Sequence, residues 1–229
     1  MAAHLGAASC DLMDLNPRAV QFMHESVEMS GLDPLRCRVV EGDIASFVPV
    51  GPYDLICANP PFVPTPPTMA GVVHSNGGDD GCAVTRLLLE KLGELLRPAG
   101  RALIWSLQIE SEAGPILAED LSQSAPNRAV EMMETTDCHI DFDRLTGSLI
   151  ATEPDAIAGI LQWRDGLVAE HGESLTLNWY LIHIGPEDAS KQELTVSSFD
   201  AERCGDAYSP RPLDHRRRIQ RLVDLEIMR

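Results

Sequence analysis

The 229-residue sequence lacks the apolar segments that mark membrane and secreted proteins. It has no run of about 18 apolar residues, which excludes an ordinary membrane-spanning helix. Residues 1–12 lack the basic start and long apolar stretch of a secretory signal. The six cysteines are scattered and form no Cys-x-x-Cys pair, so they favour neither a disulfide framework nor a zinc ribbon. We therefore expect a cytoplasmic protein with no metal site.

Basic residues are also scarce, because 18 Lys and Arg stand against 35 Asp and Glu, a net charge of −17. Residues 186–229 hold 8 basic and 9 acidic side chains, so a charge of −16 falls on residues 1–185. A broad phosphate-binding surface needs the opposite sign, which argues against a protein that binds nucleic acid over much of its surface. The acidity is equally compatible with a role in solubility or with a salt-rich habitat.

Strands and helices are predicted to alternate along the chain. Short apolar segments that end in turn residues predict strands, and longer stretches with an apolar face predict helices. Residues 1–8 have the pattern of the end of a helix. We expect strands at residues 8–15, 37–41, 53–58, 101–107, 130–136 and 175–184, and helices at residues 17–30, 83–96, 112–124 and 155–171. This alternation is typical of the α/β class with a mostly parallel sheet.

Three consecutive predicted strands end in a polar side chain, namely Asp14, Asp43 and Asn59. Parallel strands end at one edge of a sheet, and ligands of open α/β sheets bind beyond that edge. Any one of these residues alone is more often a helix cap or a turn former. The separations of 29 and 16 residues each leave room for one crossover, so we expect all three at a single edge.

The sharpest motif is Asn59-Pro60-Pro61-Phe62, directly after a predicted buried strand. Such a sequence also makes a good rigid turn. The side-chain oxygen of Asn59 and the carbonyl of Pro60 can both accept hydrogen bonds from one NH₂ group. The proline rings of Pro60 and Pro61 hold these acceptors in place, and Phe62 offers a flat face for a planar amide or base. The motif therefore predicts a site that holds an amino group with its lone pair directed at an electrophile.

Residues 14–20 (DLNPRAV), 41–43 (EGD) and 54–62 (DLICANPPF) resemble class I S-adenosylmethionine-dependent N-methyltransferases. More narrowly, they are similar to the methyltransferase small domain type with an Asn-Pro-Pro-aromatic motif, which acts on protein glutamine, on guanine in ribosomal RNA or on adenine. The resemblance implies a Rossmann-like sheet, mostly parallel, with a C-terminal antiparallel strand. It is clearest over residues 8–107. We expect a methyltransferase domain over residues 1–185 and a partly helical C-terminal extension over residues 186–229.

The resemblance implies a binding site for S-adenosylmethionine. It places Asp14 against the two ribose hydroxyls and Asp43 against the adenine amino group, with Ile44 beside the adenine. Asn16 and Asn59 complete the predicted cofactor-binding set.

The resemblance also assigns the methyl-accepting side of the site to Asn59, Pro60, Pro61 and Phe62. Asn59 and Pro60 would accept hydrogen bonds from the target nitrogen, and Phe62 would stack on it. Transfer is then driven mainly by positioning, so no residue is assigned as a general base.

The sequence departs from this family ahead of Asp14. The resemblance implies a first strand and a Gly-x-Gly-x-Gly loop there, but only 13 residues precede Asp14 and their one glycine is Gly6. The missing strand would lie between those that end at Asp14 and Asn59. We expect a gap in the sheet, with both residues still facing one cleft, and poor solubility and no measurable cofactor affinity for residues 1–229. The intact remaining motifs favour an incomplete N-terminus over a degenerate domain.

Two other functions stay open. A non-catalytic interaction module would explain the missing glycine-rich loop. A nicotinamide-dependent Rossmann enzyme would also place an acid after its second strand, but it gives no reason for the Asn-Pro-Pro-Phe motif. Among methyl acceptors, the acidic body favours a protein amide or a small-molecule amine, while an RNA or DNA base remains open. Nothing in the sequence defines the oligomeric state.

Weaker candidates lie outside the three motifs. The loop at residues 63–81 is too long for a simple connector, and we expect a lid or substrate loop. Within it, Asp79 and Asp80 are more typical of a solvated turn than of a substrate or cation site. Residues 138–143 contain Cys, His and two Asp at a spacing that fits no standard metal site. Arginines 216–218 and 221 favour an exposed helix face over a binding surface. The three tryptophans, 105, 163 and 179, are predicted core residues.

Overall fold

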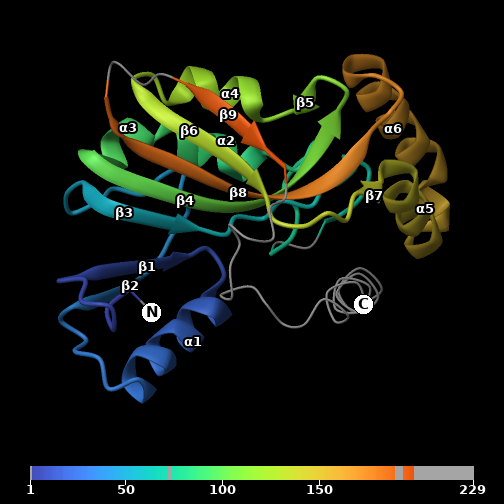
Figure 1. The fold of residues 1–229 in the computed structure, drawn as a ribbon. Helices are drawn as coiled ribbons and strands as arrows, with labels where there is room; N and C mark the ends of the chain where they lie inside the picture. The colour runs from blue at the N-terminus through green and yellow to red at the C-terminus, as the bar shows by residue number, and fades with distance from the viewer. Residues whose placement is uncertain (1, 72–73, 189–192, 199–229) are drawn as a thin grey trace. The chain divides into compact units, whose positions relative to one another are not determined.

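The computed structural model describes residues 2–71, 74–188 and 193–198 (Figure 1). The chain divides into two compact units, Met1–Val50 and Gly51–Arg229.

The first unit is a β-α-β segment. Strands β1 (Cys10–Asp14) and β2 (Cys37–Glu41) pair in parallel, and helix α1 (Pro17–Met29) connects them. The helix begins where predicted, because Asn16 caps it by accepting from Arg18 N at 3.0 Å and Pro17 suits the first turn. It ends at Met29 with Ser30 as its C-cap, and Gly31 follows with φ 63°. The helix end predicted over residues 1–8 is wrong, since residues 2–6 form hydrogen-bonded turns that close at Gly6 with φ 100°.

This unit has a small apolar core. Among its described residues, the buried apolar side chains are Val20, Val27 and Cys37. Large apolar side chains that remain exposed in it are Leu5, Leu15, Phe22, Met29, Leu35, Val48 and Val50. A two-stranded sheet with one helix buries too little surface to be stable alone.

The second unit contains a larger sheet with the strand order β3-β4-β8-β6-β9. Its strands are β3 (Tyr53–Ala58), β4 (Leu96–Ser111), β6 (Arg128–Glu134), β8 (Thr176–Glu187) and β9 (Leu194–Ser197). Strand β3 is parallel to β4, and β9 is parallel to β6, whereas β8 is antiparallel to both β4 and β6. Four strands therefore share one direction and β8 alone opposes them, which confirms a mostly parallel α/β sheet with a C-terminal antiparallel strand. Short strands β5 (Gly114–Pro115) and β7 (Ile140–Asp141) pair with its ends.

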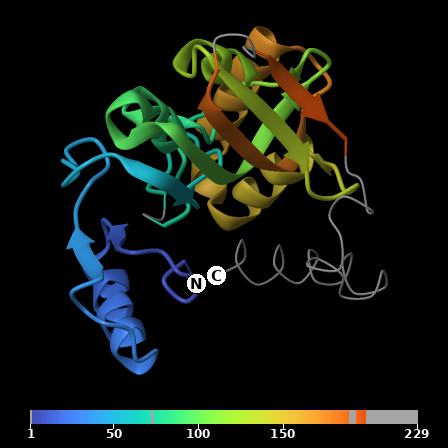
Figure 2. The ribbon, with the colours of Figure 1, turned by 60° about the vertical axis from the view of Figure 1, so that its left-hand side comes forward.

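Helices cover both faces of this sheet (Figures 1 and 2). The side chains of Leu107 and Ile109 pack with α5 (Phe142–Thr152) and α6 (Ile157–His171), which a 3₁₀ turn at Pro154–Ala156 connects. Gln108 lies between Leu107 and Ile109 in β4 and therefore faces the other way, toward α2 (Ala83–Glu90). Helices α3 (Leu92–Leu95) and α4 (Ala118–Ser124) complete the unit. None of the helices in the described residues is long and apolar enough to cross a bilayer.

Several predicted boundaries shift. The helix predicted over 83–96 is divided into α2 and α3, and β4 begins at Leu96 because Tyr53 of β3 pairs with that residue. The helix predicted over 112–124 is present only as α4, while α5 was not predicted. The predicted C-terminal extension contributes β9 to the sheet. Its predicted helix, with arginines 216–218 and 221, lies outside the described residues.

The described strands form two sheets, with β1 in one and β3 in the other. The two strands therefore do not pair directly. The gap expected between these two strands stays a prediction.

Candidate active site

The first unit brings Asp14 and Asp43 to one edge of its sheet. Asp14 is the last residue of β1 and is paired in register with Glu41, the last residue of β2. Gly42 N donates to the Asp14 carbonyl at 3.1 Å, and Asp43 follows directly. Two carboxylates therefore lie at neighbouring strand ends, as the sequence predicts for this pair.

Each of these carboxylates also orders its own turn. Asp14 Oδ1 accepts from Asn16 N at 2.8 Å, and Asp43 Oδ1 accepts from Ala45 N at 2.9 Å. Asp14 is half-buried and Asp43 is exposed. Asn16 uses its side-chain oxygen as the α1 cap, and Ile44 is half-buried beside Asp43. The second carboxylate oxygen of each aspartate has no hydrogen-bond partner among the described residues, which leaves an acceptor at each strand end.

The second unit holds the Asn59–Phe62 turn immediately after β3. The Asn59 side chain is exposed and makes no hydrogen bond within the described residues, while Pro60 and Pro61 are half-buried. An uncommitted amide oxygen on a proline-stiffened turn can accept from a ligand N–H without first breaking a protein hydrogen bond.

Phe62 belongs to an aromatic cluster that the sequence did not predict. Its ring lies edge-on to Trp179 of β8, with ring centroids 5.0 Å apart, and Trp179 lies 5.6 Å from Trp105 of β4. Trp105 and Trp179 are only half-buried, so the prediction of core positions holds for Trp163 alone, which is 8% exposed. Trp105 pairs with Leu181, two residues beyond Trp179, so the two tryptophans are diagonal neighbours on adjacent strands. One sequence does not define the register of strand pairing, so this contact could not be predicted.

An open hollow of about 350 Å³ adjoins Asn59. Apart from Asn59, its lining is apolar: Cys57, Ala58, Leu103, Trp105 and Leu181. The hollow lies on strands β3, β4 and β8 and offers an apolar surface next to the polar turn.

The loop at residues 63–81 is folded back on itself where it is described. Val63 N donates to Ser75 O at 2.8 Å, and Thr65 N donates to Gly78 O at 2.9 Å. Asp80 is not a solvated turn residue, because its carboxylate pairs with Arg86 at 2.6 Å and accepts from Cys82 N at 2.9 Å. Asp79 is exposed, and its carbonyl accepts from Trp163 Nε1 at 2.8 Å.

Within the described residues, no three His, Cys, Asp or Glu side chains are placed to hold a metal ion. In the segment 138–143, Asp141 caps α5 and Asp143 pairs with Arg164 at 2.8 Å. His139 Nδ1 lies 2.9 Å from Asn178 Nδ2. Each of these side chains already has a structural contact.

Comparisons with known proteins identify relatives for part of the chain. Residues 1–104, a little under half of the chain, match the family described as methyltransferase small domain. A release factor glutamine methyltransferase from Deinococcus radiodurans is 31% identical over 129 residues, which covers 53% of this chain and 44% of that protein. A ribosomal protein uL3 glutamine methyltransferase from Bradyrhizobium diazoefficiens is 34% identical over 109 residues, covering 43% of this chain and 33% of that protein.

The chain spans less than half the length of these curated relatives. Among solved structures, the YcgJ protein from Bacillus subtilis aligns with a TM-score of 0.45 at 16% identity, covering 79% of this chain and 83% of that one.

Proposed function

We propose that this chain, whose residues 1–104 match the methyltransferase small domain family, forms part of an enzyme that transfers a methyl group from S-adenosylmethionine to an amide nitrogen of a protein. The observation that carries the proposal is the exposed Asn59 amide without a hydrogen-bond partner in the described residues, on the rigid turn after β3. Its oxygen and the Pro60 carbonyl are acceptors for the two N–H bonds of a primary amide or amine.

The chemistry follows from this placement. S-adenosylmethionine, when bound, supplies the methyl group. The target nitrogen forms a bond to the methyl carbon as the carbon–sulfur bond breaks, and it loses one proton to solvent. Asn59 and Pro60 orient the nitrogen lone pair, and Phe62, fixed by Trp179, provides a face for the planar amide. No side chain needs to act as a general base, since the nitrogen becomes acidic only as the new bond forms.

The described residues account for part of a binding site for S-adenosylmethionine. Asp14 and Asp43 offer acceptors suited to ribose hydroxyls and an adenine amino group, with Asn16 and Ile44 shaping the same edge. The 13 residues ahead of Asp14 hold no Gly-x-Gly-x-Gly motif for the methionine part. We propose residues 1–185 as the methyl-transferring part and 186–229 as an extension.

A protein glutamine is the acceptor that the comparisons favour. Both relatives described above are named glutamine methyltransferases of translation proteins. The net negative charge of residues 1–185 also favours a protein acceptor over RNA, because RNA binding requires cations near the phosphates. A cytoplasmic location forms part of this proposal. Small-molecule amines and nucleic-acid bases are the competing acceptors.

The direct test is calorimetry with S-adenosylhomocysteine on residues 1–229 and on the chain extended upstream in its reading frame. We expect no measurable affinity for residues 1–229 and micromolar binding by the extended chain. A radiolabelled methyl group should then reach the protein fraction rather than the RNA fraction of a bacterial extract. Absence of binding by the extended chain would contradict the proposal.

Replacing Asn59 separates catalysis from cofactor binding. In the chain extended upstream, Asn59→Ala should reduce the rate of methyl transfer at least about a hundredfold. Removal of one polar side chain that contacts the reacting group has an effect of this order in other active sites. Binding of S-adenosylhomocysteine should weaken far less, since Asp14 and Asp43, the acceptors proposed for adenosine, are unchanged. Equal rates of methyl transfer by the wild type and by Asn59→Ala would show that Asn59 does not bind the methyl acceptor.

A non-catalytic interaction module is the second candidate. The exposed apolar side chains of the first unit favour it, because seven large ones lie within residues 1–50. A genuine translation start at Met1 with no glycine-rich motif encoded upstream would support this module over the enzyme.

A further inference from the structure

The chain that leaves the Asn59–Phe62 turn is supported by residues 77–82, which we call the brace. Gly77 N donates to Val63 O at 3.0 Å, and Thr65 N donates to Gly78 O at 2.9 Å. Together with a parallel bridge between Val63 and Asn76, these bonds join the segment after the turn to the segment before α2. The backbone that follows Phe62 therefore takes its direction from the brace.

The brace also touches the turn itself through Gly81. A Cβ added at Gly81 would lie 2.5 Å from the Phe62 carbonyl oxygen and 3.2 Å from Pro64 Cδ. Gly81 has φ 82°, which already favours glycine. Only a residue without a side chain lets the brace approach the turn this closely.

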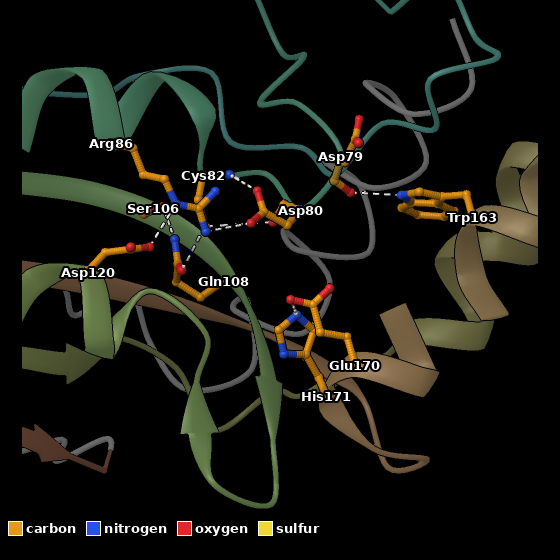
Figure 3. A network of polar contacts seen from close by, with 10 residues as sticks. All are labelled: Asp79, Asp80, Cys82, Arg86, Ser106, Gln108, Asp120, Trp163, Glu170 and His171. Carbon is orange, nitrogen blue, oxygen red and sulfur yellow. Dashed lines mark hydrogen bonds and ion pairs between the residues drawn. The ribbon is translucent and has the colours of Figure 1, made fainter. Parts of the chain in front are cut away.

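Three separate elements hold the brace (Figure 3). From α6, Trp163 Nε1 donates to the Asp79 carbonyl at 2.8 Å. From α2, Arg86 pairs with Asp80 at 2.6 Å and at the same time with Asp120 of α4 at 2.7 Å. Partial burial lowers the pKa of Arg86, but its bonds to Asp80 and Asp120 outweigh this and raise the pKa, so the charge persists at all ordinary pH.

The end of the brace is fixed to the sheet. Cys82 is fully buried, and its Sγ donates to Gln108 Oε1 at 3.3 Å, while Gln108 Nε2 donates to Ser106 Oγ at 2.6 Å. These contacts connect the brace to β4, the neighbour of β3. The turn and its support therefore rest on one rigid framework.

We propose that the brace sets the direction in which the Asn59–Phe62 turn presents its acceptors, and that Trp163 and Arg86 are positioning residues for methyl transfer. The second half of this inference rests on the proposed function. Both side chains act through the backbone of the brace. The Asp80 carboxylate stabilises the brace, because it pairs with Arg86 and accepts a hydrogen bond from Cys82 N.

Hydrogen exchange on the full chain tests the brace without any need for activity. In Arg86→Gln, the amides of Thr65 and Gly77 should exchange about tenfold faster than in the wild type. Arg164→Gln is the control, because Arg164 also pairs with two aspartates, Asp143 and Asp165, and neither of them belongs to the brace. Arg86→Lys should restore much of the protection. Unchanged exchange in Arg86→Gln, or an equal increase in Arg164→Gln, would overturn the proposal.

A pair of glycine variants tests the close approach. Gly81→Ala and Gly172→Ala both place alanine at a positive φ, 82° and 105°, but only Gly81 has atoms of the turn within 4 Å. Gly81→Ala should therefore increase exchange at Thr65 and change the fluorescence of Trp179, which contacts Phe62. The same changes in Gly172→Ala would show that backbone strain alone is responsible.

Kinetics tests the link to catalysis. In the chain extended upstream, Trp163→Phe and Arg86→Gln should lower kcat about tenfold while the KM for S-adenosylmethionine changes far less, because Asp14 and Asp43, the acceptors proposed for adenosine, are unchanged. A parallel rise in KM, or no change in kcat, would refute the positioning role. If the chain extended upstream transfers no methyl group, the proposed function fails, and the exchange experiment on residues 1–229 still decides whether the brace holds the turn.

Discussion

At the scale of single residues, Cys82 shows how burial changes an ionisable group. Its side chain is fully buried at the start of α2, where Sγ donates to Gln108. Burial, with the nearby negative charge of Asp80, raises the pKa of the Cys82 thiol from 9.0 to about 12. The thiol therefore stays neutral across the range in which an unfolded cysteine ionises.

This pKa shift predicts a loss of stability in alkali. Between pH 9 and pH 12, the unfolded chain releases the thiol proton and the folded chain keeps it, so the free energy of unfolding falls as pH rises. The slope from this one group approaches about 1.4 kcal/mol per pH unit. Urea unfolding at several pH values should show a shallower decline in Cys82→Ala than in wild type. Exposed Cys57 gives the control, and Cys57→Ala should leave the slope unchanged.

At the scale of elements, the most accurate predictions were the strands at 37–41 and 53–58, whose bounds the structure confirms. Both are short apolar segments that end in strong turn residues, Gly42 and Pro60, so local signals define them. Helix α5 was missed because its sequence contains Gly147 and few strong helix formers. It folds through tertiary contacts of Phe142 and Leu145, including a Phe142–Trp163 ring contact at 5.3 Å.

The candidate site was predictable only in pieces. Asp14, Asp43 and Asn59 could be predicted because each lies at the end of an apolar strand or within two residues after it. The brace was not, because its partners Trp163, Arg86 and Gln108 lie on three different elements and meet it only in the folded chain. No signal in one sequence specifies such contacts. The roles assigned to the site residues, and the shared cleft for Asp14 and Asn59, stay predictions.

Arg128 shows how one side chain connects elements. It is 5% exposed at the start of β6, and its guanidinium donates to the carbonyls of Gly100 and Gly185 at 3.1 and 2.9 Å and to the Glu187 carboxylate at 2.9 Å. Because these partners belong to β4 and β8, Arg128 ties the ends of three strands together.

Removing this charge should be costly. Arg128→Met leaves the carbonyls of Gly100 and Gly185 without their donor, so we expect a loss of about 3 kcal/mol in the free energy of unfolding. Arg164→Met removes a more exposed arginine with two ion pairs and should cost less than about 1 kcal/mol. Urea unfolding measures both, and similar losses for the two variants would contradict this interpretation of Arg128.

At the scale of the whole molecule, the apolar core is unevenly divided. Among the described residues, Met1–Val50 buries Val20, Val27 and Cys37, and every other buried apolar residue lies in the second unit. We expect the first unit to unfold at a lower denaturant concentration than the second. Hydrogen exchange should show α1 and β1 losing protection before β4 and β8. Loss of protection in both units at one concentration would show a single cooperative unit instead.

The position of β8 in the sheet has a consequence for synthesis of the chain. Strands β4 and β6 are not neighbours, and each pairs with β8, which runs from Thr176 to Glu187. While the ribosome is still making residues up to 175, β6 has no partner among the strands that precede it. The second sheet is therefore completed late, after β8 has been synthesised and has paired with both β4 and β6. Since pairings between distant residues form slowly, a chaperone that shields β4 and β6 during this interval would act on the step most exposed to aggregation.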